Sequence, residues 1–230
     1  MASPAGLLSL LQLTDSFFPS GGFAYSWGLE TCVSDGLVTG RKGLEQFLSA
    51  YLGGQFAGTD ALGVKIAFEA AEKGDLAAVM RLDGRLNAMK TARESREGGL
   101  QIGRQILKVM TALHQSTLLR EFARKVENRQ TFGHHAPVFG LACQAMGVSK
   151  PHSVQAFLYQ AASGVVSAGV RLIPLGHMDG QRALYRIRET IGAIARAVEP
   201  LGEEDLSSFA PALEIRAMRH ETLYSRLFRS

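Results

Sequence analysis

The chain has 230 residues, 46% of them hydrophobic and 20% charged, which excludes a disordered or fibrous protein and allows a substantial buried core. Its formal net charge of +4 permits contact with an acidic partner or with nucleic acid but requires neither. The two cysteines, Cys32 and Cys143, form no CxxC motif, so we expect reduced thiols in a cytosolic protein.

Near the start of the chain, no targeting segment is predicted. The apolar run at residues 7–13 has the length of a signal-peptide core, but no basic segment precedes it, and Asp15 follows instead of a small-residue cleavage site. No apolar run approaches the ~20 residues of a membrane helix. We therefore expect a cytoplasmic protein with no membrane partner.

Aromatic residues surround a proline and paired glycines in the segment 15–30. Pro19 fixes its own φ, whereas Gly21 and Gly22 permit a positive φ or a close backbone approach. The aromatic residues are Phe17, Phe18, Phe23, Tyr25 and Trp27. A turn this apolar is expected to be buried, either in the protein's own core or under a partner.

Helical periodicity dominates the rest of the chain. The polar segment 93–99 is the expected loop or helix break, and the helix after it has one apolar face, formed by Leu100, Gly103, Leu107 and Met110. His134 and His135 are adjacent and would point in different directions on a helix. A helix start before Pro137 is therefore favoured over a metal site.

Three further helices are predicted in the last third of the chain. Pro151 suits the first turn of one, and Pro174 and Gly176 end it. Asp179 is the expected cap of the next helix, and Ser207 or Ser208 of the last. The apolar positions of these helices are Val154, Leu158, Ala161, Val165, Ala168, Leu184, Ile187, Ile191, Ile194, Val198, Leu213, Ala217 and Met218.

The expected fold class is all-α, a single-domain bundle of several antiparallel helices over residues 1–230. Strand signals are weak, because the best candidate, residues 170–175, is short and contains a proline. The chain has 25 glycines in 230 residues, more than the usual ~7%, and we expect two structural roles for them. Those expected to end helices are Gly74, Gly147 and Gly202. Those expected to let helices approach closely are Gly103, Gly164 and Gly169.

Catalytic motifs are missing from the sequence. Residues 36–42 resemble a P-loop only loosely, because the glycine spacing is wrong and no Ser or Thr follows the lysine. The chain has no GxSxG, HExxH or EF-hand motif, and no two histidines or cysteines are spaced i, i+4. We therefore predict no catalytic residue, no metal ligand, no cofactor and no enzymatic activity.

The C-terminal residues 224–230 are unusually apolar for a chain end. Leu227 and Phe228 lie between Arg226 and Arg229, and a small apolar anchor beside arginines is common in interaction hot spots. Two alternatives stay open: the tail folds back onto its own core, or it docks on a partner. Flexibility from about residue 225 is compatible with the second.

Four segments resemble the urease accessory protein family UreF. Phe18 to Glu30 is similar to the signature Phe-Pro-x-Gly-x-Phe/Tyr-x-x-Ser-x-Gly-Leu-Glu. Residues 135–140 (HAPVFG), 171–181 (RLIPLGHMDGQ) and 218–230 (MRHETLYSRLFRS) resemble the same family in the same order. His177 stands where the family typically has Gln, which adds an imidazole able to face a metal.

The resemblance implies an all-helical, homodimeric protein that is not an enzyme. UreF proteins bridge the accessory protein UreD, also called UreH, to the GTPase UreG. The assembly delivers nickel to the active site of the urease apoprotein, coupled to GTP hydrolysis by UreG. The nucleotide site then belongs to the partner, which fits the missing P-loop.

The resemblance also implies which residues contact partners. Phe23 is the aromatic expected to face UreG, and Phe18 is expected in the core. Tyr159 matches a family tyrosine near the dimer contact, and residues 226–230 resemble the portion that becomes ordered against UreD. The full predicted set is Phe18, Pro19, Gly21, Phe23, Ser26, Glu30, Tyr159, Arg171, His220, Glu221, Arg226, Leu227 and Phe228.

Two other functions remain as alternatives. A GTPase-activating protein would supply an arginine finger to UreG, with Arg96, Arg104 or Arg171 as nominees. A basic nucleic-acid binder is less favoured, because the aromatic residues cluster in the least charged segment and not among the basic residues.

Overall fold

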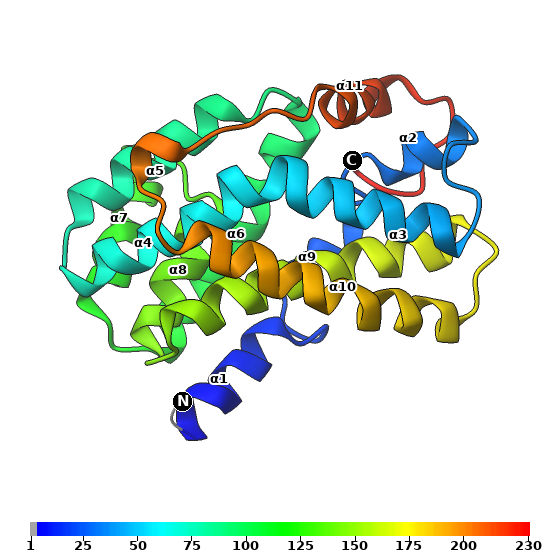
Figure 1. The fold of residues 1–230 in the computed structure, drawn as a ribbon. Helices are drawn as coiled ribbons and strands as arrows, with labels where there is room; N and C mark the ends of the chain where they lie inside the picture. The colour runs from blue at the N-terminus through cyan, green and yellow to red at the C-terminus, as the bar shows by residue number, and fades with distance from the viewer. Residues whose placement is uncertain (1–3) are drawn as a thin grey trace.

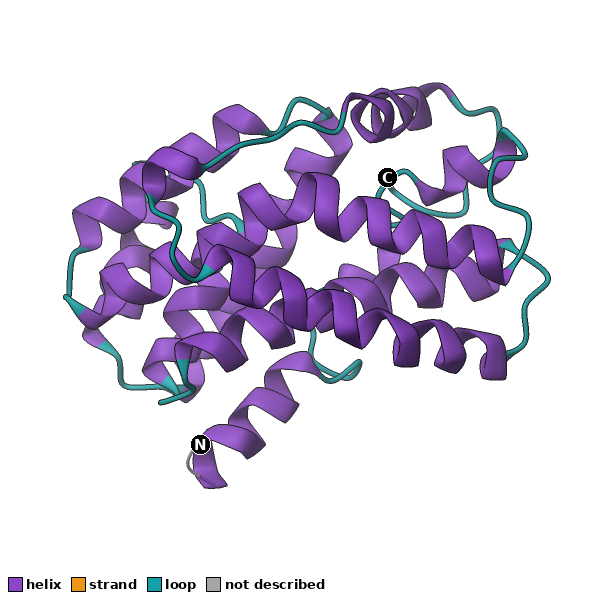
Figure 2. Ribbon diagram, in the orientation of Figure 1, coloured by secondary structure: helices purple, strands orange, loops and turns teal. Residues whose placement is uncertain are grey.

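The computed structural model describes residues 4–230, and within that range the chain is helical and contains no strand (Figure 2). The all-α prediction is therefore confirmed. The helices, including short 3-10 and π segments labelled η, are α1 (Pro4–Thr14), η1 (Gly22–Ala24), α2 (Leu29–Ser34), α3 (Arg41–Ala50), η2 (Tyr51–Ala61), α4 (Leu62–Glu72), α5 (Leu76–Met89), α6 (Arg93–Leu113), α7 (Thr117–Glu127), α8 (His135–Ala145), α9 (Lys150–Leu172), α10 (His177–Val198), η3 (Glu203–Asp205), α11 (Pro211–Arg219) and η4 (His220–Thr222).

The core lies around α8, which packs against α4, α6 and α9. α9 and α10 run antiparallel side by side, and α10 also covers α3 and η2 (Figure 1). α1 extends away from the body, α7 lies at one end and α2 at the other (Figure 1). No helix of the described chain combines the length and apolar character needed to cross a bilayer.

Glycine allows neighbouring helices to pack this closely. A Cβ at Gly103 of α6 would lie 2.3 Å from the Gly133 carbonyl oxygen, and one at Gly169 would lie 2.9 Å from Leu44, as predicted for close helix packing. A Cβ at Gly164 would meet no atom within 4 Å, so the same prediction was wrong there, because that face of α9 borders a cavity.

Helix-ending glycines follow backbone geometry. Gly74 and Gly147 have φ of 66° and 68° after α4 and α8, which confirms their predicted role. Gly202 has φ −109° and precedes η3, so it does not end α10.

Two helix starts differ from the predictions. α10 begins at His177 with Gly176 as its N-cap, and Asp179 lies in the first turn. α11 begins at Pro211 with Ala210 as its N-cap, so neither Ser207 nor Ser208 caps it. Pro211 has the φ of a first helical residue and lacks an amide hydrogen, so it favours a helix start at this position.

Residues 93–99 form the first two turns of α6 and not a loop. Gly98 and Gly99 are buried there, because Tyr25 and His134 pack directly on them; a Cβ at Gly98 would lie 2.6 Å from Tyr25 Cε1. Residues 170–172 are the last turn of α9, which confirms that the weak strand candidate at residues 170–175 was rightly set aside. The helix start predicted before Pro137 is confirmed, because α8 begins at His135.

Candidate functional site

The turn after α1 separates its aromatic residues into an inner and an outer set. Phe18 is 8% exposed, whereas Phe23, on η1, is 71% exposed, as both were predicted. Gly21 has φ 77° and caps η1, the left-handed geometry that favours glycine. Arg171 Nη2 of α9 donates a hydrogen bond to the Phe23 carbonyl oxygen at 2.9 Å. The turn therefore presents Phe23 outward from a fixed backbone.

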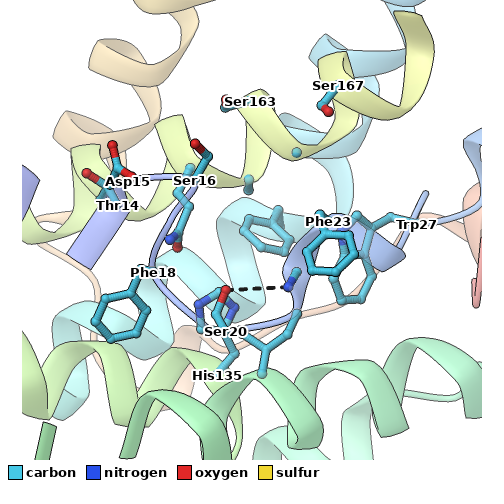
Figure 3. Close-up of a pocket in the computed structure, with 16 residues that line it drawn as sticks. Thr14, Asp15, Ser16, Phe18, Ser20, Phe23, Trp27, His135, Ser163 and Ser167 are labelled. Atoms are coloured by element: carbon cyan, nitrogen blue, oxygen red, sulfur yellow. Dashed lines mark hydrogen bonds between the residues drawn. The ribbon is translucent and has the colours of Figure 1, made fainter. Parts of the chain in front are cut away.

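A cavity of about 170 Å³ lies beneath this turn, against α8 and α9. Figure 3 shows Phe18 and Phe23 on opposite sides of it, with His135 below and Ser163 and Ser167 on the α9 side. The Gly22 amide donates to Ser20 Oγ across its rim. Aromatic rings and hydroxyl groups thus share the lining.

His135 brings an unusual polar atom to the cavity. Its Nε2 is buried and has no hydrogen-bond partner, although part of the ring faces the cavity. Burial lowers the pKa of His135 to about 4, so the imidazole is neutral at pH 7. In residues 4–230 no three His, Cys, Asp or Glu side chains converge as a metal site would require.

The C-terminal tail packs directly on the opening turn. The amides of Ser26 and Trp27 donate to the main-chain oxygen of Ser230 at 2.6 and 3.0 Å, and Ser26 Oγ donates to the same oxygen. The Arg229 amide donates to the Ala24 carbonyl at 2.8 Å. The alternative in which the tail folds back onto its own body is therefore the one observed.

Glu30 is the main acceptor for the tail. Its Oε1 accepts from the Leu227 amide at 2.6 Å, and its Oε2 accepts from the Phe228 amide at 3.0 Å. His220 Nε2 lies 2.9 Å from the same Oε2, and its Nδ1 lies 2.6 Å from Glu94 Oε2. The two ring nitrogens of His220 thus face two different carboxylates. We call Glu30, Glu94 and His220 the tail clasp.

The remaining tail residues divide by orientation. Phe228 is 5% exposed and lies under the Arg171 guanidinium, 4.3 Å from the ring centroid. Arg226 pairs with Glu94 at 2.9 Å but stays exposed, and Leu227 is 62% exposed. Tyr224 is fully exposed. The tail thus has an inner anchor and an outer face.

The structure brings most of the predicted partner-binding residues together, but it turns several inward. Phe18 is buried in the core. Ser26, Glu30, His220 and Phe228 are buried and bonded within the chain, so direct contact with a partner would require the tail to move. The predicted residues at or near the surface are Pro19, Gly21, Phe23, Tyr159, Arg171, Glu221, Arg226 and Leu227. Among them, Glu221 pairs with Arg93 at 2.7 Å.

Sequence reasoning missed two features of the site. Glu94 lies in the segment expected to be a loop, so nothing placed it beside His220. α1 exposes Leu7, Leu8 and Leu11, and Phe17 beyond it is 93% exposed. The sequence interpretation of this apolar run considers only a signal peptide, although repeated leucines in a short helix are also a usable signal for a docking surface.

The arginines nominated as fingers all bind main-chain carbonyls of this chain. Arg96 Nη1 donates to Lys90 O at 2.8 Å, and Arg104 Nε donates to Phe132 O at 2.9 Å. Arg171 holds the Phe23 carbonyl, as described above. His177, the departure from the family pattern, is exposed at the start of α10.

Comparisons with known proteins agree on one family. The UreF family model matches residues 38–188. The urease accessory protein UreF of Bacillus sp. (strain TB-90) is 38% identical over 224 residues, which cover 97% of this chain and 99% of that protein. UreF of Actinobacillus pleuropneumoniae serotype 3 is 40% identical, with 96% and 98% covered, and UreF of Haemophilus influenzae (strain Rd) is 39% identical, with 96% and 94% covered. These alignments extend over nearly the whole chain, beyond the residues that the family model matches.

Proposed function

This chain belongs to the UreF family of urease accessory proteins, and we propose that it bridges UreD (UreH) to the GTPase UreG while nickel is delivered to apo-urease. In this role nickel is the cargo, the nucleotide belongs to UreG, and this chain is a non-enzymatic scaffold. We place this assembly in the cytoplasm, where both cysteines stay reduced; both are free and buried.

The outward Phe23 is the observation that carries the UreG assignment. An aromatic ring that is 71% exposed on a backbone fixed by Arg171 loses little entropy on docking, which is typical of a hot-spot residue. Phe23→Ala should leave the melting temperature unchanged and weaken co-purification of UreG. Tyr185→Ala on α10, another 70% exposed aromatic, is the matched control. Equal recovery of UreG by wild type and Phe23→Ala would refute the assignment.

The outer face of the tail is the proposed UreD contact. Tyr224 and Leu227 are exposed while Phe228 anchors the tail from inside. Leu227→Ala with Tyr224→Ala should therefore weaken UreD binding without lowering stability. Phe228→Ala should lower stability by about 3 kcal/mol, because a buried ring is lost. If the Leu227→Ala, Tyr224→Ala double variant binds UreD like wild type, the outer face of the tail is not the UreD contact.

A second copy of this chain is the proposed occupant of the α1 face. α1 projects from the body (Figure 1), and Gln160 Nε2 of α9 donates to the Leu13 carbonyl at 3.2 Å, so α1 ends beside exposed Tyr159. Leu8→Glu with Leu11→Glu should convert a dimer to a monomer in light scattering. A variant that stays dimeric would place the dimer contact elsewhere.

We prefer a scaffold over a GTPase-activating role because Arg96, Arg104 and Arg171 already bind main-chain carbonyls. An arginine finger needs a guanidinium free to reach the transferred phosphoryl group. Turnover of GTP by UreG, measured with and without this protein, separates the two functions. Acceleration abolished by a single one of these Arg→Ala changes would establish the activating role.

A further inference from the structure

The charge of the chain is concentrated at the end of the body that carries α7. Residues 104–129 contain six cations and two carboxylates, Glu121 and Glu127, so this segment accounts for the formal net charge of +4 of the whole chain. The cations are Arg104, Lys108, Arg120, Arg124, Lys125 and Arg129. In residues 4–230 none of these six takes part in a salt bridge, whereas the cations elsewhere commonly do.

A groove of about 800 Å³ runs between α6, α7 and the segment after α7 at this end. Its rim carries the exposed cations Arg104, Lys108 and Arg129. Its floor is apolar and contains Leu107, Ala123, Val126 and Phe132, the last of which is 41% exposed. Positive charge around an apolar floor favours an acidic ligand that also carries an apolar side chain.

One wall of the groove is held rigidly from beneath. The fully buried Asp83 accepts hydrogen bonds from Thr131 Oγ1 at 2.6 Å and from the amides of Phe132, Gly133 and His134 at 2.7, 2.8 and 2.8 Å. Arg104 Nε fixes the Phe132 carbonyl from the other side. A wall fixed before binding lowers the entropy lost on docking.

We propose that this α6–α7 groove docks an acidic protein segment through an apolar anchor side chain. α7 lies at the end of the body away from α2 (Figure 1), and the groove shares no residue with the turn or the tail, so this is a separate interaction surface. A nucleic acid fits less well. The apolar floor offers a sugar–phosphate chain no partner, whereas it can take up an apolar side chain of a protein segment.

The test is fluorescence anisotropy with the full chain and three probes. They are the labelled peptide Asp-Glu-Leu-Glu-Asp-Leu-Glu-Asp, the same peptide with serine for leucine, and a single-stranded oligothymidylate. The leucine peptide should bind most tightly, and binding should weaken as salt rises toward roughly 0.5 M. Lys108→Glu with Arg129→Glu should weaken its binding by at least about fivefold, since two attractions become repulsions.

A matched control keeps the test specific. Arg188→Glu with Arg196→Glu makes the same change in net charge at two exposed positions of α10 that have no salt bridge in the described chain. This control should bind the peptide like wild type, and circular dichroism should show both double variants folded. The proposal is overturned if the leucine peptide does not bind, or if the serine peptide binds as tightly as the leucine peptide. It is also overturned if the oligothymidylate binds more tightly than the leucine peptide, or if both double variants weaken peptide binding equally.

Discussion

Replacing Glu30 by alanine tests whether one carboxylate holds the C-terminal tail. The change removes the acceptor for the amides of Leu227 and Phe228 and for His220 Nε2. If the tail stayed docked, these three donors would lose their acceptor in a buried site, at about 1–3 kcal/mol each. Neither the Leu227 nor the Phe228 amide has another acceptor in the structure.

In the Glu30→Ala variant, releasing the tail costs less free energy than keeping it docked with these donors unpaired. It gives up the burial of the Phe228 ring, about 2–3 kcal/mol, and the main-chain bonds around Ser230. In return the freed donors bind water, and each released residue regains about 1–2 kcal/mol of backbone entropy. We therefore expect Glu30→Ala to detach residues 226–230 while the helical body stays folded.

Hydrogen exchange is the direct assay. The amides of Leu227 and Phe228 should exchange at least about a hundredfold faster in Glu30→Ala, and those of Ser26 and Trp27 should follow because their acceptor leaves with Ser230. Glu72→Ala is the control, because Glu72 is exposed and forms no salt bridge in the described chain. Unchanged exchange at Leu227 and Phe228 in a folded Glu30→Ala protein would refute the clasp.

Two further predictions concern the core. Because burial lowers the pKa of His135 from 6.5 to about 4, the unfolded chain binds more protons at this side chain than the folded chain does between these values. The contribution of His135 to stability is therefore fully present above pH 6.5 and falls by about 3 kcal/mol toward pH 4. Denaturant titrations across this range should show a smaller loss for His135→Gln, and the exposed His177→Gln should follow wild type. Gly103→Ala should lower stability by about 3 kcal/mol or more, because its methyl group would lie 2.3 Å from a main-chain oxygen. Gly164→Ala should raise stability by about 0.5–1 kcal/mol, because its methyl group would lie in open space on a helix. Melting curves that rank these two glycine variants in the opposite order would contradict the packing argument.

Local patterns predicted the helices where the chain's own chemistry decides them. Pro151 lies in the first turn of α9, Gly74 and Gly147 end their helices with positive φ, and α8 begins at the second of the two adjacent histidines. These signals depend on dihedral preferences within a few residues, which the tertiary fold seldom overrides.

Sequence patterns gave wrong predictions at glycines, because a glycine can either end a helix or allow a neighbouring element to pack closely. Gly98 and Gly99 look like a break in a polar segment, yet both are buried inside α6 because Tyr25 and His134 pack on them. Gly164 looks like a packing glycine but borders a cavity. Whether a glycine ends a helix or admits a neighbour depends on what approaches it, and that neighbour lies far away in sequence.

The same distinction between local pattern and tertiary contact applies to the opening turn and the tail. By itself the sequence determined the family, the all-helical class and the aromatic turn, because these follow from residue identity and short-range periodicity. Only the tertiary structure decided that the tail closes on that turn, since the clasp joins Glu30, Glu94 and His220 across gaps of 126 and 190 residues. Burial and hydrogen bonding over such distances are properties of the packed chain, and they bury Phe18 and Tyr25 while leaving Phe17 and Phe23 at the surface, where a partner can reach them.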